Sequence, residues 1–370
     1  IIMKKYFYGF CLIFSSLLVT LIFIEIVLLC FPVNQGLRTQ AVNESFPIFR
    51  FKPNREVQYS KNWNFSLQNR VKINNVGFVS DFDYLKGLTS PLLAIIGDSY
   101  VEALMVPFHK TLTGITSDIA KANGGRVYSF AASGAGLSQH MVWAKYARKT
   151  FSPDAYVFVI IANDFMESLQ SYESSPGFHR FKIQSEKDWS MVLSEYEPSI
   201  LRRLLRNSRL AMYMVTNLKI HGKLGIPLIL GKKDKRVKYV GNVEFDYNKQ
   251  FWRDAKLAAN IYLNNLPEWT DVSESKILFI IDGIRPDLYS EQKLSATKDS
   301  FWYKMREYFI SEANIKGYQV IDMQNIFLKN YTENKIKFEF KNDLHWNQYG
   351  HSVVSKALSS SNLWNEIFKN

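Results

Sequence analysis

The residues best suited to chemistry in this chain are a serine, a histidine and an aspartate that stand far apart in the sequence. Ser99 follows a short apolar run and a Gly-Asp turn, a placement that would expose its hydroxyl beside backbone N–H groups. His345 could take the proton of that hydroxyl, and Asp343 could hold the imidazole in the tautomer that a general base requires. Each alone also has an ordinary interpretation, a helix N-cap for Ser99 and a packing histidine for His345.

Two further residues could stabilise the negative charge that attack by a serine creates on a carbonyl oxygen. Gly134 can bring its backbone N–H close to such an oxyanion, and Asn163 can offer its side-chain amide. With the N–H of Ser99 they would supply three donors. Taken singly, Gly134 also fits a turn, and Asn163 also fits a cap at a strand end.

Cysteine and histidine content limits other chemistry. The two cysteines, Cys11 and Cys30, both lie in an apolar N-terminal stretch, which excludes a disulfide framework and a thiolate metal site. The chain has six histidines, and no cluster with metal-ligand spacing along the sequence accompanies His345. We therefore predict neither a metal nor a cofactor.

The candidate residues follow short apolar runs that are typical of strands buried on both faces of a parallel sheet. The predicted strands are Leu92–Ile96, Val127–Phe130, Tyr156–Ile161, Ile277–Ile281 and Tyr318–Ile321. Helical stretches, for example Thr111–Asn123 and Leu137–Thr150, lie between them. This alternation predicts an α/β fold, an open five-stranded parallel sheet with helices on both faces and a ligand site beyond the carboxyl ends of the strands.

The length of the chain allows more than this sheet. With 370 residues, 47% of them hydrophobic, the protein can form a large core, so a disordered chain is excluded. We divide it into a transmembrane anchor (1–36), a non-helical approach segment (37–90) and an α/β domain (91–370). The long interval between the third and fourth predicted strands indicates an insertion at about 170–275, which we expect to pack as a helical cap.

The N-terminal stretch is long and apolar enough to span a membrane. Tyr6–Ile24 carries no charge, and after Glu25, interpreted as an interfacial residue, the apolar character resumes over Ile26–Val33. No small-residue cleavage pattern follows, which favours an anchor over a cleaved signal. Because Lys4 and Lys5 precede the span, we expect a cytoplasmic N-terminus and a catalytic domain in the periplasm or outside the cell, taking the membrane to be a bacterial inner membrane.

Positive charge is concentrated in one segment. The chain has 46 Lys and Arg against 34 Asp and Glu, a net charge of +12. Arg202–Lys238 holds eleven basic residues and one acid, Asp234, and so accounts for +10. The segment is either a solvated face or a contact to an anionic surface. Lipid headgroups or an acidic glycan are the favoured surfaces. We expect no nucleic acid, because a domain beyond the membrane rarely meets it. The leucines beside its arginines, such as Leu201 and Leu204, suit a helix that lies on a membrane surface.

In combination, these residues resemble the SGNH (GDSL-type) hydrolases, whose four blocks contribute Ser, Gly, Asn and His in that chain order. Ser99, Gly134, Asn163 and His345 match this order, and each follows the appropriate strand. The resemblance covers roughly residues 71–163 and 277–358. Segments such as Val71-Lys72-Ile73-Asn74-Asn75-Val76-Gly77-Phe78 look like those of members with one N-terminal membrane span.

The resemblance implies a flavodoxin-like fold in which Ser99 is the nucleophile, His345 the base and Asp343 its orienting acid. It also implies an oxyanion hole made by the N–H of Ser99, by Gly134 and by Asn163. Two positions depart from the family pattern. Asn342 stands where many members place the triad acid, and Ile161 stands where the third block often begins with Gly.

We therefore expect a membrane-anchored serine esterase, for example a carboxylesterase or deacetylase, or an O-acyltransferase that uses the same acyl-enzyme at Ser99. The expected partners are the lipid bilayer and an O-acylated cell-envelope glycan or lipid as substrate. The alternative is a catalytically idle protein of the same fold that binds glycan or serves as a scaffold in the envelope. Reaction of Ser99 with a serine-directed probe would separate the two.

Overall fold

The computed structural model describes residues 2–172, 176–220, 239–240, 244–245, 249–285, 289, 300–341 and 343–369. The chain forms two compact units. The first comprises Ile1–Arg38, Glu56–Val71 and Pro198–Lys233, and the second comprises Thr39–Arg55, Lys72–Glu197 and Asp234–Asn370. Each unit is therefore assembled from segments that are distant in the sequence.

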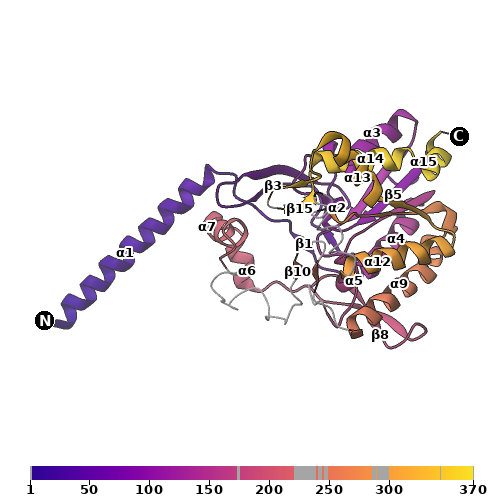
Figure 1. The fold of residues 1–370 in the computed structure, drawn as a ribbon. Coiled ribbons are helices and arrows are strands. Elements are labelled where there is room, and N and C mark those ends of the chain that lie inside the picture. Colours follow the sequence, from indigo (N-terminus) through magenta and orange to yellow (C-terminus); the bar gives the residue numbers. More distant parts are fainter. Residues whose placement is uncertain are drawn as a thin grey trace. The chain divides into compact units, whose positions relative to one another are not determined.

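The second unit is organised around a five-stranded parallel sheet (Figure 1). Its strands are β5 (Leu92–Gly97), β6 (Arg126–Ala131), β7 (Ala155–Ile160), β12 (Ile277–Ile281) and β13 (Gln319–Asp322). They are ordered β13-β12-β7-β5-β6, the flavodoxin-like order, and every neighbouring pair runs parallel. The predicted α/β sheet is confirmed, and the predicted strand ends are correct to within about one residue.

Helices cover both faces of this sheet, as predicted. They are α2 (Ser99–Glu102), α3 (Leu112–Ala122), α4 (Leu137–Phe151), α5 (Asp164–Glu167), α9 (Lys249–Thr270), α12 (Phe301–Ile315), α13 (Met323–Asn334), α14 (Gln348–Ser359) and α15 (Asn362–Phe368), with short 3₁₀ turns η1 (Phe108–Lys110) and η3 (Glu274–Lys276). Because β5, β7 and β12 are buried at every residue, their apolar runs contact helices on both sides. On one face Ile95 and Val157 share a core with α3, α13, α14 and α15, and on the other Phe279 contacts Tyr262 of α9 and Phe309 of α12.

Short antiparallel strands surround the sheet. They are β1 (Thr39–Gln40) with β2 (Arg50–Phe51), β8 (His179–Ile183) with β9 (Trp189–Leu193), β10 (Tyr239–Val240) with β11 (Glu244–Phe245), and β14 (Glu339–Phe340) with β15 (Asp343–Trp346). The expected helical cap is only partly helical, because β8 and β9 form a hairpin within the predicted insertion. Strands of five residues give too short a pattern to identify from sequence. Much of Arg202–Lys238 lies outside the described residues.

The first unit contains α1 (Ile2–Leu29), the two-stranded sheet of β3 (Arg55–Lys61) and β4 (Leu67–Ile73), and the short helices α6 (Ile200–Leu205), α7 (Arg209–Met212) and η2 (Tyr213–Asn217), the last a π-helix. Within α1, Tyr6–Leu29 is long and apolar enough to cross a bilayer, and only 6% of its most apolar window is buried in the protein. A helix with these properties occurs both in signal sequences and in membrane anchors.

Candidate active site

A serine, a histidine and an aspartate meet at the carboxyl end of β5. Ser99 is the first residue of α2, and Asp343 and His345 lie on β15. Nε2 of His345 is 2.8 Å from Oγ of Ser99, and Nδ1 of the same ring contacts Oδ1 of Asp343. The backbone N–H of His345 also donates to Asp343 Oδ1, at 3.1 Å. This is the sequence of contacts, nucleophile to base to acid, that a catalytic triad requires.

Asp98 stabilises the turn from which Ser99 begins α2. As the N-cap of α2, it accepts a hydrogen bond from the backbone N–H of Tyr100 through Oδ1, at 2.9 Å. Its Oδ2 is 3.0 Å from the Oγ of Ser99. Because the hydroxyl has one proton, Ser99 can donate it either to Asp98 or to His345, and only the second arrangement starts catalysis. Ser99 is therefore both the start of a helix and a nucleophile candidate.

The Gly134 loop is tied to the helix that carries the serine. Gly134 has a φ of +88°, in the left-handed region that glycine adopts without strain. Its neighbour Ser133 donates to Oε2 of Glu102, the last residue of α2, from the backbone N–H at 3.0 Å and from its hydroxyl. Burial raises the pKa of Glu102 to about 7, so this anchoring carboxyl is half protonated near neutral pH. Nothing in the sequence around Glu102 indicates this contact.

A group of carboxylates connects Asn163 to the turn that holds Ser99. Its side-chain amide donates to Oε2 of Glu167 at 2.8 Å, which fixes the orientation of the amide and leaves its second N–H for another acceptor. Carboxylate oxygens of Asp98, Asp164 and Glu167 all lie within 4.8 Å of one another. The segment that follows β7 thus adjoins the turn that holds Ser99.

The carboxylates of Asp98, Asp164 and Glu167 lie close together, although the spacing of these residues along the sequence is not that of a metal site. Such a group has the geometry to hold a cation. A proton can also offset its charge, because burial, reinforced by the nearby carboxylates, raises the pKa of Asp164 well above its usual range. Burial likewise raises the pKa of Asp98. We assign the group no step in catalysis.

A buried network braces the segment that carries the histidine. Arg285 forms an ion pair with Asp282 at 3.0 Å, with both side chains fully buried, and donates to the hydroxyl of Tyr100 at 2.6 Å. That hydroxyl donates to the backbone carbonyl of Leu344 at 2.9 Å. Asp282 also accepts from the indole N–H of Trp346, at 2.9 Å. The residues on either side of His345 are therefore held to the residue after Ser99.

A second histidine near the site has a structural role. His351, on α14, is buried, and its Nδ1 accepts a hydrogen bond from the backbone N–H of Leu112 at 3.1 Å. Burial lowers its pKa to about 3, so it stays neutral and holds the start of α3. His345 is partly exposed and contacts Ser99, so it is the histidine placed to act as the base. Asn342, the other position considered for the acid, lies outside the described residues.

The fold is α/β, and the contacts from Ser99 through His345 to Asp343 follow the order found in the catalytic triads of serine hydrolases. A model of the family of GDSL-like lipases and acylhydrolases matches residues 93–358, which include every candidate site residue. The chain therefore belongs to the GDSL-like lipase/acylhydrolase family. No curated protein matches it in sequence.

Solved structures with a similar fold include a lipolytic G-D-S-L protein of Veillonella parvula, with 11% identity, coverage of 73% of this chain and 98% of that one, and a TM-score of 0.35. A lipase from a goat rumen metagenome has 11% identity, coverage of 74% and 98%, and a TM-score of 0.40. An acetyl xylan esterase has 12% identity, coverage of 73% and 98%, and a TM-score of 0.37. At these values the family assignment depends on the sequence match and not on structural likeness.

Proposed function

We propose that this protein is a serine esterase, or an O-acyltransferase that uses the same acyl-enzyme, anchored in a membrane and acting on an O-acylated cell-envelope glycan or lipid. The observation that carries the proposal is the contact of Ser99 with His345 and of His345 with Asp343 in a chain of the GDSL-like lipase/acylhydrolase family. Geometry and family both favour an active enzyme over an idle binding module.

The first half of the reaction forms an ester on the serine. Nε2 of His345 takes the hydroxyl proton while Oγ of Ser99 attacks the acyl carbonyl, and Asp343 stabilises the resulting imidazolium through Nδ1–H. The backbone N–H groups of Ser99 and Gly134 and the amide of Asn163 donate to the oxyanion of the tetrahedral intermediate. When that intermediate collapses, His345 returns the proton to the departing alcohol, and the acyl group remains on Ser99.

The second half decides between hydrolysis and transfer. Water, or a sugar hydroxyl, gives its proton to Nε2 of His345 and attacks the acyl-Ser99 carbonyl. When this intermediate collapses, the bond to Oγ of Ser99 breaks, His345 returns the proton to Oγ, and a carboxylic acid or a new ester leaves. The residues of the triad are the same in both cases. Water access and the fit of the acceptor set the outcome, so the two reactions are alternatives for one site.

The anchor and the basic residues support the choice of substrate. An enzyme held by α1 on the outer side of a membrane meets envelope glycans and lipids at high local concentration, and nucleic acid is not expected there. The basic residues of Arg202–Lys238 would favour anionic acceptors or headgroups over neutral ones. The lysine pair before the span supports a cytoplasmic N-terminus.

The test is hydrolysis of a short-chain aryl ester by the full chain in detergent, with Ser99→Ala and His345→Ala as variants. Matched controls are Ser275→Ala and His109→Ala, which change exposed residues outside the site. We expect both site variants to lose activity by about 10³-fold or more and both controls to keep it. Full activity in Ser99→Ala would refute the proposal. Measuring how much free carboxylic acid and how much acylated oligosaccharide the protein produces then distinguishes a hydrolase from a transferase.

A further inference from the structure

The apolar helix of the first unit carries one acid, and that acid has a defined set of partners. Both carboxylate oxygens of Glu25 are used: Oε1 accepts from the backbone N–H of Arg209 at 2.6 Å, and Oε2 accepts from the N–H of Leu210 and the hydroxyl of Ser208, each at 2.8 Å. These donors are the N-cap and first residues of α7, whose N–H groups lack partners within the helix. Glu25 therefore ties α7 to α1.

The position of Glu25 along α1 sets the depth at which this contact lies in the membrane. It lies four residues before the end of α1, about 6 Å along the helix axis at 1.5 Å per residue. A carboxylate one turn from the end of an apolar span lies near the boundary of hydrocarbon and headgroups, where hydrogen-bond donors are needed to satisfy it. Removal of α1 as a cleaved signal would strip α7 of this partner, so the contact favours a helix that is retained.

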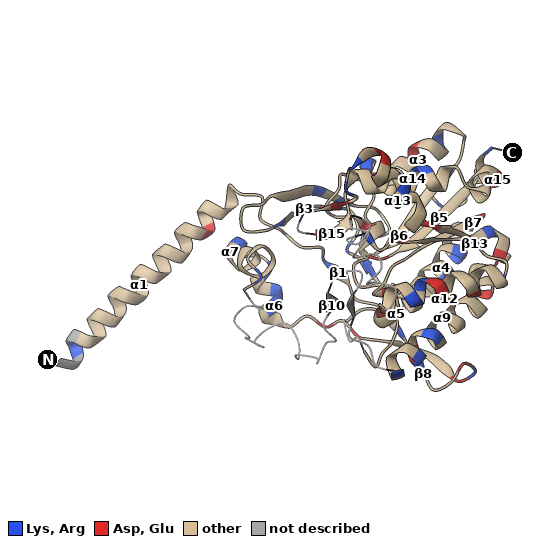
Figure 2. Cartoon of the chain, in the orientation of Figure 1, with Lys and Arg blue, Asp and Glu red and all other residues tan. Residues whose placement is uncertain are grey.

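The helix preceding α7 presents apolar side chains outward. Ile200, Leu201 and Leu204 of α6 are 69%, 52% and 64% exposed. The same six-residue helix contains Arg202 and Arg203, visible as a basic segment in Figure 2. Exposed aliphatic residues interleaved with arginines are characteristic of helices that lie in a membrane interface.

The rest of the first unit continues this surface with aromatic residues. Phe65, in the turn between β3 and β4, stacks on Phe31 directly after α1, with ring centroids 5.8 Å apart, and packs on Tyr213 at 5.5 Å. The hydroxyl of Tyr213 donates to the carbonyl of Trp63, whose ring is exposed. Tyrosine and tryptophan beside the end of an apolar helix are typical of the interfacial belt of membrane proteins.

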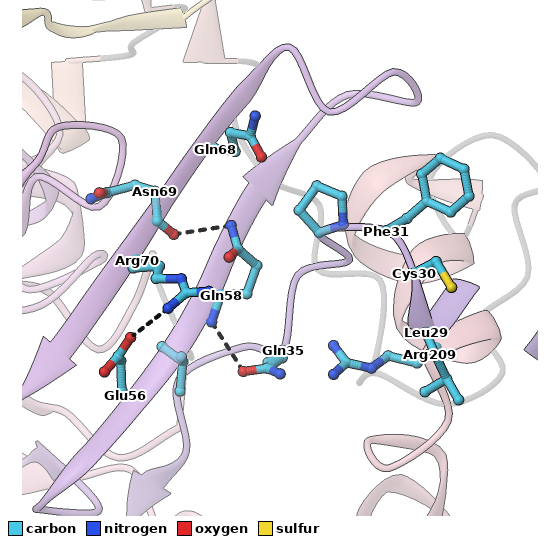
Figure 3. A pocket seen from close by; sticks show the side chains of 12 residues that line it. Leu29, Cys30, Phe31, Gln35, Glu56, Gln58, Gln68, Asn69, Arg70 and Arg209 are labelled. Carbon is cyan, nitrogen blue, oxygen red and sulfur yellow. Dashed lines mark hydrogen bonds and ion pairs between the residues drawn. The ribbon is translucent and has the colours of Figure 1, made fainter. Parts of the chain in front are cut away.

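A groove of about 750 Å³ lies beside the same end of α1 (Figure 3). Its apolar lining residues are Leu29, Cys30, Phe31, Pro32 and Val57, and its polar ones are Gln35, Glu56, Gln58, Gln68, Asn69, Arg70 and Arg209. Glu56 pairs with Arg70 at 3.6 Å, which leaves the guanidinium of Arg209 without a carboxylate among the lining residues. Gln58 links the strands and the anchor, since its backbone N–H donates to Gln35 at 3.0 Å and its amide to the carbonyl of Asn69 at 3.3 Å. Amide and guanidinium groups at this level suit lipid headgroups rather than acyl chains.

We propose that residues 200–217 and the β3–β4 turn form an interfacial platform that lies in the headgroup region of the leaflet in which α1 ends. Glu25 latches this platform to the anchor, and the side chains of Ile200, Leu201 and Leu204 are buried in lipid. The platform does not depend on the catalytic proposal, because every residue in it belongs to the first unit. It requires that α1 spans the bilayer.

The platform is tested with single cysteines in the full chain, in phospholipid nanodiscs and a Cys11→Ser, Cys30→Ser background. Leu204→Cys carries an environment-sensitive fluorophore, and Ile315→Cys, 75% exposed on α12 of the second unit, is the matched control. Quenching by a spin-labelled lipid is compared with quenching by aqueous iodide. We expect lipid quenching of the Leu204 label and iodide quenching at least roughly threefold weaker than at Ile315.

A third label at Phe14→Cys, in the middle of α1, separates the two ways in which this experiment can fail. If Phe14 is quenched by lipid while Leu204 responds only to iodide, the platform is refuted and the anchor stands. If Phe14 also responds to iodide, the anchor itself is refuted and the platform with it. The latch is tested by adding Glu25→Ala, with the exposed Glu44→Gln as control. Glu25→Ala should raise iodide quenching at Leu204 to the level of Ile315, and an unchanged signal would refute the latch.

Discussion

Glu102 should make the folded protein less stable as the pH rises towards neutrality. Burial raises the pKa of its carboxyl from 4.5 to about 7 despite the hydrogen bonds that Ser133 donates. Between these values the folded chain holds a proton that the unfolded chain has released, so the free energy of unfolding falls as the pH rises through this window and levels off above it. About 2.5 pKa units at about 1.36 kcal/mol each give a total of about 3 kcal/mol.

The assay compares urea unfolding of the full chain in detergent with that of Glu102→Gln, from about pH 4 to pH 8. The amide keeps the shape of the side chain and an acceptor for Ser133 but cannot ionise. The variant should match the wild type near pH 4 and exceed its stability by about 3 kcal/mol at pH 8. Glu333→Gln, at an exposed position on α13, should leave the pH dependence unchanged. Parallel curves for wild type and Glu102→Gln would refute the reasoning.

Three further predictions concern the site. Asp343→Asn should lower kcat by about 10³- to 10⁴-fold while fluorescence and circular dichroism remain native. A small loss would mean that another residue is the acid that orients His345. Asn163→Ala should lower kcat by about 10²- to 10³-fold with little change in KM, whereas a change in KM alone would remove it from the oxyanion hole. Arg285→Met leaves Asp282 buried without its cation and should cost about 3 to 5 kcal/mol in urea unfolding; the exposed Arg253→Met should cost under about 1 kcal/mol, and equal costs would contradict the bracing role.

The sheet could be predicted from sequence because its strands are buried on both faces. The run Tyr156–Ile161 consists of apolar residues, and its recurrence with helical stretches between such runs is typical of a parallel sheet covered by helices on both faces. The residues that follow β5 and β7 could then be assigned to one end of the sheet. The β8–β9 hairpin could not be predicted, because each of its strands has only five residues and so gives too short a pattern of polar and apolar residues.

The supporting residues of the site could not be found from sequence for a different reason. Arg285 meets Tyr100 across 185 positions of the chain, and neither residue stands in a pattern that distinguishes it from other arginines and tyrosines. Glu102 and Glu167 likewise read as ordinary helix residues until their partners are placed. The sequence places Glu25 near the end of the apolar span, but its hydrogen bonds to α7 come from residues more than 180 positions away. Such contacts depend on tertiary packing, which local periodicity does not record.

Activation of Ser99 is tested most directly by labelling the full chain with a fluorophosphonate and locating the adduct by mass spectrometry. An activated serine reacts because a base removes its proton, so we expect one adduct, on the peptide that contains Ser99. Labelling should be absent in Ser99→Ala and strongly slowed in His345→Ala, and the exposed-serine variant Ser275→Ala should label like the wild type. Labelling of another serine in the folded wild type, or equal labelling without His345, would mean that Ser99 is not activated by His345.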